Sequence, residues 1–135
     1  MERFKSITKS YYKNSHCIVL VFDLTNVQSF KNLANWMDSI NKHREEYKSE
    51  PYPHTTIAGM KSDIATERNV NIEIINQFCA DNDITYFEAS AKNGNGINEM
   101  FNNVCIKLLV MPNVIKIEQK TEITNPKKFF KCLSC

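Results

Sequence analysis

The stretch CIVLVFD, residues 17–23, decides how this chain folds. It is a nearly unbroken apolar run, it is rich in β-branched residues, and it ends in an aspartate. Alternating apolar and polar residues would indicate a strand with one wet face, whereas an unbroken short run indicates a strand buried on both faces. Strands of that kind belong to parallel sheets with helices on both sides. The run therefore predicts an α/β protein.

The rest of the chain alternates extended and helical patterns. A second strand is predicted over residues 54–60 and a brief third one over residues 85–88. Apolar residues at steps of three and four predict three helices, which end near residue 46, near residue 79 and before Pro112. Their apolar positions are Phe30, Leu33, Ala34, Met37 and Ile40, then Ile72, Ile75, Phe78 and Cys79, then Ile97, Met100, Phe101, Val104, Cys105, Leu108 and Leu109. This alternation predicts a parallel three-strand sheet with flanking helices and right-handed crossovers.

Polar segments follow each predicted strand. In such sheets, ligands bind beyond the carboxyl ends of the strands. Asp23, residues 60–63 (MKSD) and residues 90–92 all fall at that edge. Their placement favours a functional role for Lys61 and Asp63. The alternative, that both are ordinary loop residues, stays open at this point.

Composition and charge limit the class of protein. The chain has 135 residues, which suits one domain, and its net charge is +2. Residues 113–135 hold five lysines against two glutamates, a net of +3 that leaves −1 for the remainder. A neutral body argues against nucleic-acid binding, and a basic tail fits an anionic membrane surface. The polar start is not a signal peptide, and no run approaches the ~18–20 apolar residues of a membrane span, so we expect a cytoplasmic protein.

The five cysteines fall into two groups. Cys17, Cys79 and Cys105 lie inside apolar patterns and are predicted to be reduced core residues. Cys132 and Cys135 form a C-x-x-C at the end of the sequence. A metal or redox pair is the alternative for these two, but no second pair or nearby histidine completes a zinc site. We therefore predict no metal site.

Five stretches together resemble the Rab family of small GTPases, the vesicle-traffic branch of the Ras superfamily. ERFKSITKSYYKNS (2–15) resembles the end of the switch II region with its helix, LVFDLT (20–25) the next strand and SFKNLANWM (29–37) the next helix. MKSD (60–63) resembles the Asn-Lys-x-Asp guanine loop, and EASAKNGNGI (88–97) resembles the Ser-Ala-Lys loop. The resemblance implies the P-loop NTPase-like fold of small G proteins. It covers the C-terminal two thirds of that fold only.

The resemblance implies a role for each residue of the two loops. Asp63 would accept hydrogen bonds from the edge of guanine, and Lys61 would lay its stem along the ring. The Ala91 N–H would meet the exocyclic oxygen, while Ser90 and Lys92 would brace the loop. These five residues are the predicted guanine-binding set.

Met60 is the degenerate position of this set, because the family has Asn there. A thioether is a weak acceptor and donates nothing. The sequence also contains no G-x-x-x-x-G-K-[ST] loop, no magnesium-binding switch I and no Asp-x-x-Gly motif, with which the intact family holds GTP or GDP and magnesium. We therefore expect no tight nucleotide binding, no hydrolysis and no catalytic residue.

The resemblance also predicts a division of the chain. Residues 1–112 are expected to form a partial Rab-like G domain, and residues 113–135 a flexible, basic hypervariable tail. The tail ends in KKFFKCLSC, so lipidation is predicted at Cys132 and Cys135, with one or two prenyl groups left open. Lysines plus lipid make a two-part anchor, which would hold the protein peripherally on the cytosolic face of a membrane.

Partners and function follow as expectations. In the family sheet another strand lies beside the one at 17–23, so this strand is expected to be an exposed hydrophobic edge that favours self-association. Rab escort and effector proteins are the other partners that the resemblance implies. Three functions remain open: a lipid-anchored binding module or decoy without GTPase activity, a fragment of a longer active Rab GTPase, or a non-functional remnant.

Overall fold

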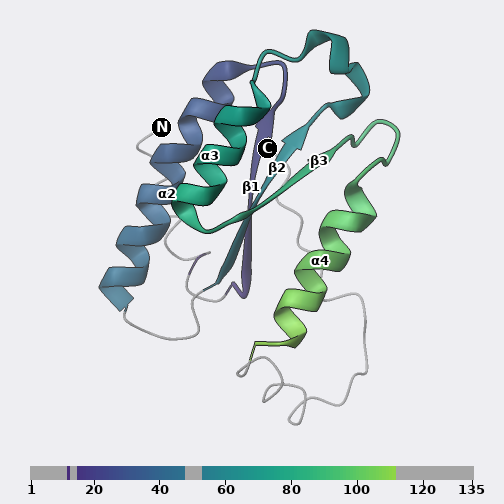
Figure 1. Cartoon of the computed structure of the whole chain (residues 1–135). Coiled ribbons are helices and arrows are strands. Elements are labelled where there is room, and N and C mark those ends of the chain that lie inside the picture. The colour runs from purple at the N-terminus through teal and green to yellow at the C-terminus, as the bar shows by residue number, and fades with distance from the viewer. Residues whose placement is uncertain (1–11, 13–14, 48–52, 112–135) are drawn as a thin grey trace.

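The computed structural model describes residue 12 and residues 15–47 and 53–111. In this part of the chain, strands and helices alternate (Figure 1). In order they are β1 (Cys17–Asp23), α2 (Val27–Tyr47), β2 (His54–Met60), the 3₁₀ segment η2 (Ser62–Glu67), α3 (Ile72–Asn82), β3 (Thr85–Ala89) and α4 (Ile97–Leu109). The predicted α/β class is confirmed.

The sheet is parallel throughout, in the order β1-β2-β3. Helix α2 connects β1 to β2 and helix α3 connects β2 to β3, as parallel strands require. The register aligns Asp23 with Met60 and Met60 with Ala89. All three strands therefore end at the same edge of the sheet, and β1 is the outer strand on one side of the described sheet.

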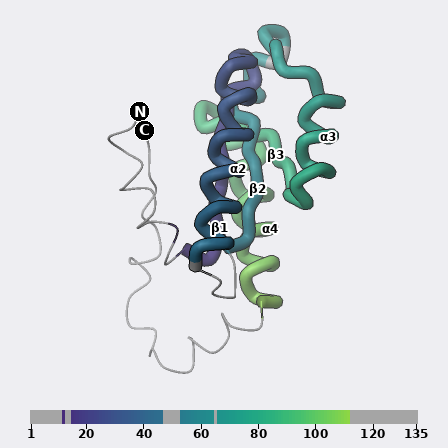
Figure 2. Tube along the Cα trace, turned by 90° about the vertical axis from the view of Figure 1, so that its left-hand side faces the viewer, coloured from purple at the N-terminus to yellow at the C-terminus, as the bar shows by residue number. Residues whose placement is uncertain are grey.

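Helices lie on both faces of the sheet. In Figure 1, α2 and α3 lie on one side of the strands and α4 on the other, and Figure 2 shows α2 in front of the strands with α4 behind them. The larger core lies between the sheet and α2 with α3. Its buried residues include Leu20, Phe22, Leu24, Phe30, Leu33, Met37, Ile40, Ile57, Val70 and Ile75. Each large side chain buried there contributes about 1.5–3 kcal/mol relative to exposure.

Most predicted boundaries agree with the structure. The bounds of β1 and β2 are those predicted, β3 is one residue longer, and α4 spans the predicted apolar stripe and ends before Pro112. Helix α2 begins earlier than its apolar stripe, because the Asn26 carboxamide oxygen accepts from the Gln28 N–H (3.0 Å) and the Ser29 N–H (3.3 Å). Helix α3 runs on to Asn82 and ends where Asp83 turns into the left-handed region at φ 51°.

Some of the predicted core positions are wrong. Ala34, Ile72, Cys105 and Leu109 are exposed, and Cys17 and Cys79 are only half-buried. Cys105 is exposed because the sheet covers only a narrow strip of helix α4. Helix α4 packs mainly on β2 and β3, so Met100 and Val104 are buried while the flank that carries Cys105 is left open.

Candidate functional site

Three loops meet at the carboxyl edge of the sheet, at the top of Figure 1. They follow Asp23, Met60 and Ala89, which the strand register places side by side. Parallel strands bring their carboxyl ends to one edge, so chain segments far apart in sequence become neighbours there. The predicted site residues stand in the second and third of these loops.

Lys61 is held by the end of the neighbouring strand. Its ammonium nitrogen lies 2.7 Å from Asp23 Oδ2, and its backbone is in the left-handed region at φ 67°. Asp23 Oδ1 accepts from the Thr25 N–H at 2.8 Å and from the Thr25 hydroxyl at 2.7 Å. Burial would raise the pKa of Asp23, but the hydrogen bonds from Lys61 and Thr25 outweigh it and hold that pKa below its ordinary value. Asp23 therefore stays ionised and fixes the direction of the Lys61 side chain.

Asp63 is oriented by the third loop. The Ser90 hydroxyl donates to Asp63 Oδ1 at 2.5 Å, and this bond is the main cause that lowers the pKa of Asp63. Ser90 is fully buried, and its hydroxyl oxygen also accepts the Lys92 N–H at 3.2 Å. The Lys92 ammonium lies 3.7 Å from Asp63 Oδ2, although its side chain is 81% exposed. Ser90 thus connects the two loops and keeps a carboxylate in a defined position.

Ala91 and Met60 complete the predicted set. Ala91 is exposed in the loop whose ends are joined by two backbone bonds, Ser90 N–H to the Asn95 oxygen and Gly94 N–H to the Ser90 oxygen, each 2.9 Å. Met60 is half-buried, and its carbonyl accepts the Leu24 N–H at 3.1 Å. A thioether at this position can offer only a weak acceptor.

A sequence profile of the Ras family matches residues 1–110. The chain belongs to the Ras family. Its α/β fold is that of a partial Ras-like domain, as the resemblance implied.

Rab proteins are among the relatives of this Ras-family chain. It is 37% identical over 115 residues to the Ras-related protein RabN1 of Dictyostelium discoideum, a match that covers 75% of this chain and 52% of the relative. It is 34% identical over 109 residues to the Ras-related protein Rab-13 of Mesocricetus auratus, covering 81% and 51%. It is 32% identical over 100 residues to the Ras-related protein RABD2b of Arabidopsis thaliana, covering 74% and 47%. The chain thus spans about half the length of the curated relatives it matches.

The structure adds residues that the sequence reasoning did not assign. Asp23 was placed at the ligand edge, but its role as the partner of Lys61 was not predicted. Arg68 and Glu88 form an ion pair beside the site, and nothing in the sequence analysis pointed to it. A charged residue at the end of an apolar strand was the available signal for Asp23. Cys132 and Cys135, the predicted lipidation sites of this Ras-family chain, lie outside the described residues.

The two loops offer two charged groups that are held in fixed positions. A carboxylate held by Ser90 and a lysine held by Asp23 suit a guanine base, because both keep their charge and direction. Over residues 15–47 and 53–111, no group of three acidic, histidine or cysteine side chains is placed to hold a metal ion. Among the helices that the structure describes, none has the length and apolar character needed to cross a membrane.

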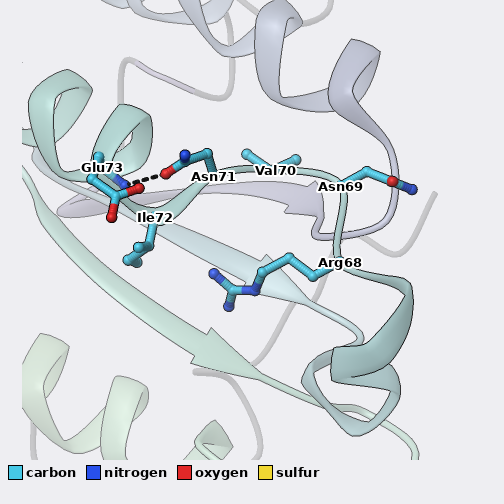
Figure 3. Close-up of a pocket in the computed structure, with 6 residues that line it drawn as sticks. All are labelled: Arg68, Asn69, Val70, Asn71, Ile72 and Glu73. Carbon is cyan, nitrogen blue, oxygen red and sulfur yellow. Dashed lines mark hydrogen bonds between the residues drawn. The ribbon is translucent and has the colours of Figure 1, made fainter.

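A separate hollow of about 360 Å³ lies at the start of α3 (Figure 3). It is lined by Arg68, Asn69, Val70, Asn71, Ile72 and Glu73. The side chain of Asn71 points back to the first turn of the helix and accepts the Glu73 N–H at 2.8 Å. The helix start is therefore already capped by a side chain of this chain.

Proposed function

We propose that the carboxyl edge of the sheet reads a guanine base. The observation that supports this is the carboxylate of Asp63, which Ser90 holds by a 2.5 Å hydrogen bond and whose pKa is lowered. An ionised carboxylate is an acceptor at both oxygens, and guanine presents two adjacent donors on its pairing edge. Lys61 would cover the ring with its stem, and the Ala91 N–H would meet the exocyclic oxygen.

We propose further that these residues alone bind nucleotide weakly and do not hydrolyse it. Met60 removes a hydrogen-bonding partner, which costs about 1–3 kcal/mol, or one to two decades of affinity. The 135 residues contain no phosphate-binding G-x-x-x-x-G-K-[ST] loop. Phosphoryl transfer depends on positioning and on charge stabilisation around the phosphates, which that loop and magnesium supply in the intact family.

An NMR titration of the full chain with guanosine and with GDP tests both parts. We expect weak binding of similar strength for the two ligands, because the phosphates of GDP find no cradle. Asp63→Ala should abolish the shifts, whereas Asp38→Ala, on the exposed face of α2, should not. Submicromolar GDP binding in calorimetry would contradict the weak-binding proposal, and unchanged titration of Asp63→Ala would contradict base reading.

A second candidate is that the chain belongs to a longer, active Rab GTPase. The match to only about half the length of its relatives supports this reading. The test is to sequence the transcript upstream of the Met1 codon. An in-frame G-x-x-x-x-G-K-[ST] there would establish the longer enzyme, and a nearby in-frame stop would remove it.

We also propose that the protein acts at the cytosolic face of a membrane, as a lipid-anchored module or decoy that binds Rab escort or effector proteins. Support comes from the Rab relatives and from the sequence KKFFKCLSC, in which lysines precede Cys132 and Cys135. Intact-mass measurement of the protein from its native cells tests this. One prenyl group with loss of the last three residues or two groups on a full-length tail would support the anchor, and an unmodified, wholly soluble protein would refute it.

Finally, we propose that β1 mediates self-association. Val21 in the middle of this strand is 59% exposed, on the face opposite the buried Leu20 and Phe22. In the described sheet β1 pairs only with β2, so its other side offers unpaired backbone groups beside apolar side chains. Such edges pair with other chains.

A further inference from the structure

We propose that Glu88, near the end of β3, is a positioning residue that holds Arg68, and with it the segment that carries Asp63, against β3 just before the Ser90 loop. The inference rests on the base-reading role proposed above and deepens it. Glu88, Arg68 and Tyr86 do not belong to the set that would touch the base. They form a second bridge outside it.

The contacts of Glu88 define this bridge. One carboxylate oxygen, Oε1, accepts from the Arg68 guanidinium and from the Tyr86 hydroxyl, the latter at 2.6 Å. Arg68 follows η2, five residues after Asp63, and Glu88 lies two residues before Ser90. Glu88 belongs to β3, so the ion pair joins the far end of the Asp63 segment to the strand from which the Ser90 loop leaves. Hydrogen bonds to charged groups are the stronger kind in proteins.

Glu88, Tyr86 and Arg68 each have a pKa that is shifted away from neutral pH. Burial would raise the pKa of Glu88, but the hydrogen bonds from Arg68 and Tyr86 outweigh it and lower that pKa. Burial, followed by the neighbouring Glu88, raises the pKa of Tyr86, so the phenol remains a donor. The hydrogen bond to Glu88 raises the pKa of Arg68. At neutral pH Glu88 is therefore ionised, Arg68 is charged and Tyr86 is a neutral donor, as the bridge needs.

The bridge is fixed to the core through Tyr86. Its ring stacks on Phe22 with centroids 6.2 Å apart and planes 24° apart. Its hydroxyl passes over Gly59, where an added Cβ would lie only 2.9 Å from that oxygen. The absence of a side chain at Gly59 is what leaves room for the phenol to reach Glu88.

The segment that carries Asp63, between β2 and α3, is not held by regular helical hydrogen bonds of its own. Lys61 is left-handed, and Ile64 departs from helical geometry at φ −115°, ψ 52°, so η2 is not a regular helix that holds itself. Beyond it, the backbone N–H groups of Asn69 and Val70 bond to the Leu24 oxygen at 2.9 and 3.2 Å. Figure 3 shows the Arg68 side chain extending from this loop over the strands. Arg68 and these two backbone bonds thus hold the far end of the segment that carries Asp63.

Amide hydrogen exchange of the full chain, followed by NMR, tests the bridge without any ligand. Glu88→Gln should speed exchange of residues 62–67 and 90–95 about tenfold, since it removes charge-assisted hydrogen bonds, while α2 stays unchanged. Arg68→Gln should give the same pattern, and the double variant should go no further than either single one. Glu45→Gln, an exposed carboxylate on α2, is the matched control and should change nothing.

The second readout is a guanosine titration. The dissociation constant should rise about threefold to tenfold in Glu88→Gln and stay unchanged in Glu45→Gln, because loops that move independently present Asp63 in the right place less often. Exchange that rises equally in α2, additive effects of the two substitutions, or loops that stay unchanged would each overturn the proposal. If the native chain shows no guanosine shifts while the exchange pattern appears, base reading fails and the bridge from Arg68 to Glu88 stands.

Discussion

Replacing Gly96 by alanine should destabilise the protein far more than its position in a surface loop suggests. Gly96 precedes α4 at φ 71°, a region that costs a residue with a side chain about 1–2 kcal/mol. An added Cβ would also lie 2.0 Å from the Glu88 carbonyl oxygen, so the start of α4 must move away from β3. That movement strains the bond from the Met100 N–H to the Gly96 oxygen, now 3.0 Å, worth about 0.5–1.5 kcal/mol, and loosens the buried Met100 side chain. The expected loss is about 3 kcal/mol or more, a large share of the ~5–15 kcal/mol by which domains are stable.

Gly94 supplies the matched control for this experiment. It also has a positive φ, 81°, but an added Cβ would meet no atom within 4 Å. Gly94→Ala should therefore cost only the backbone term of about 1–2 kcal/mol. Urea denaturation of the full chain, followed by circular dichroism and by the fluorescence of Trp36 on α2, measures both variants. Equal losses for the two alanines would refute the reasoning that the close approach of α4 to β3 constrains this site.

Three further predictions concern the edges of the sheet. Met60→Asn should tighten guanosine binding about tenfold, since an amide restores a donor and an acceptor, and an unchanged NMR titration would count against the predicted damage at this position. Val21→Lys should shift the chain towards monomer in sedimentation velocity, whereas Ile74→Lys, at an equally exposed position on α3 (58% against 59%), should leave its distribution unchanged. The pKa of Asp63 is lower in the folded protein than its ordinary value of about 3.9, so its stabilising effect is complete above that pH and is lost as the pH falls through the lower folded value. The urea midpoint should therefore fall more steeply with acid in the native chain than in Asp63→Asn, and parallel curves would show that the Ser90 bond carries no such effect.

The sheet could be predicted from sequence because burial on both faces leaves a direct mark on composition. CIVLVFD at residues 17–23 has no polar residue until its last position, and the strand in the structure has those bounds. Helix α4 could be predicted equally well, since its apolar stripe runs from Ile97 to Leu109 without a break. The burial of each stripe residue was less predictable. A stripe records which face is apolar, but the neighbours decide how much of it is covered, and so Cys105 lies exposed beside the buried Val104.

In the candidate site, too, some features could be predicted from the sequence and others could not. Motif resemblance named Lys61 and Asp63, whose spacing along the chain is local. It missed Asp23 as the partner of Lys61, because that contact joins residues 38 positions apart in sequence, across two strands. The left-handed backbone of Lys61 was likewise invisible, since a lysine carries no preference for that conformation. Contacts between loops depend on strand register, and register is a property of the assembled sheet.

The way these loops are held bears on what the site lacks. The loop after β2 is fixed by residues from the two neighbouring strand ends: Lys61 by Asp23 at the end of β1, and Asp63 by Ser90, which directly follows β3. No contact in this set needs a bound base to complete it. A site whose polar groups are already oriented does not have to order them on binding, so little affinity is lost there. The weak nucleotide binding that we propose therefore comes from the missing amide at Met60 and from the missing contacts to the phosphates. Selectivity for guanine over other bases should persist even where total affinity is low. A titration with adenosine in place of guanosine, under the same conditions, should give no shifts at Asp63, and shifts equal to those of guanosine would show that Asp63 does not select guanine.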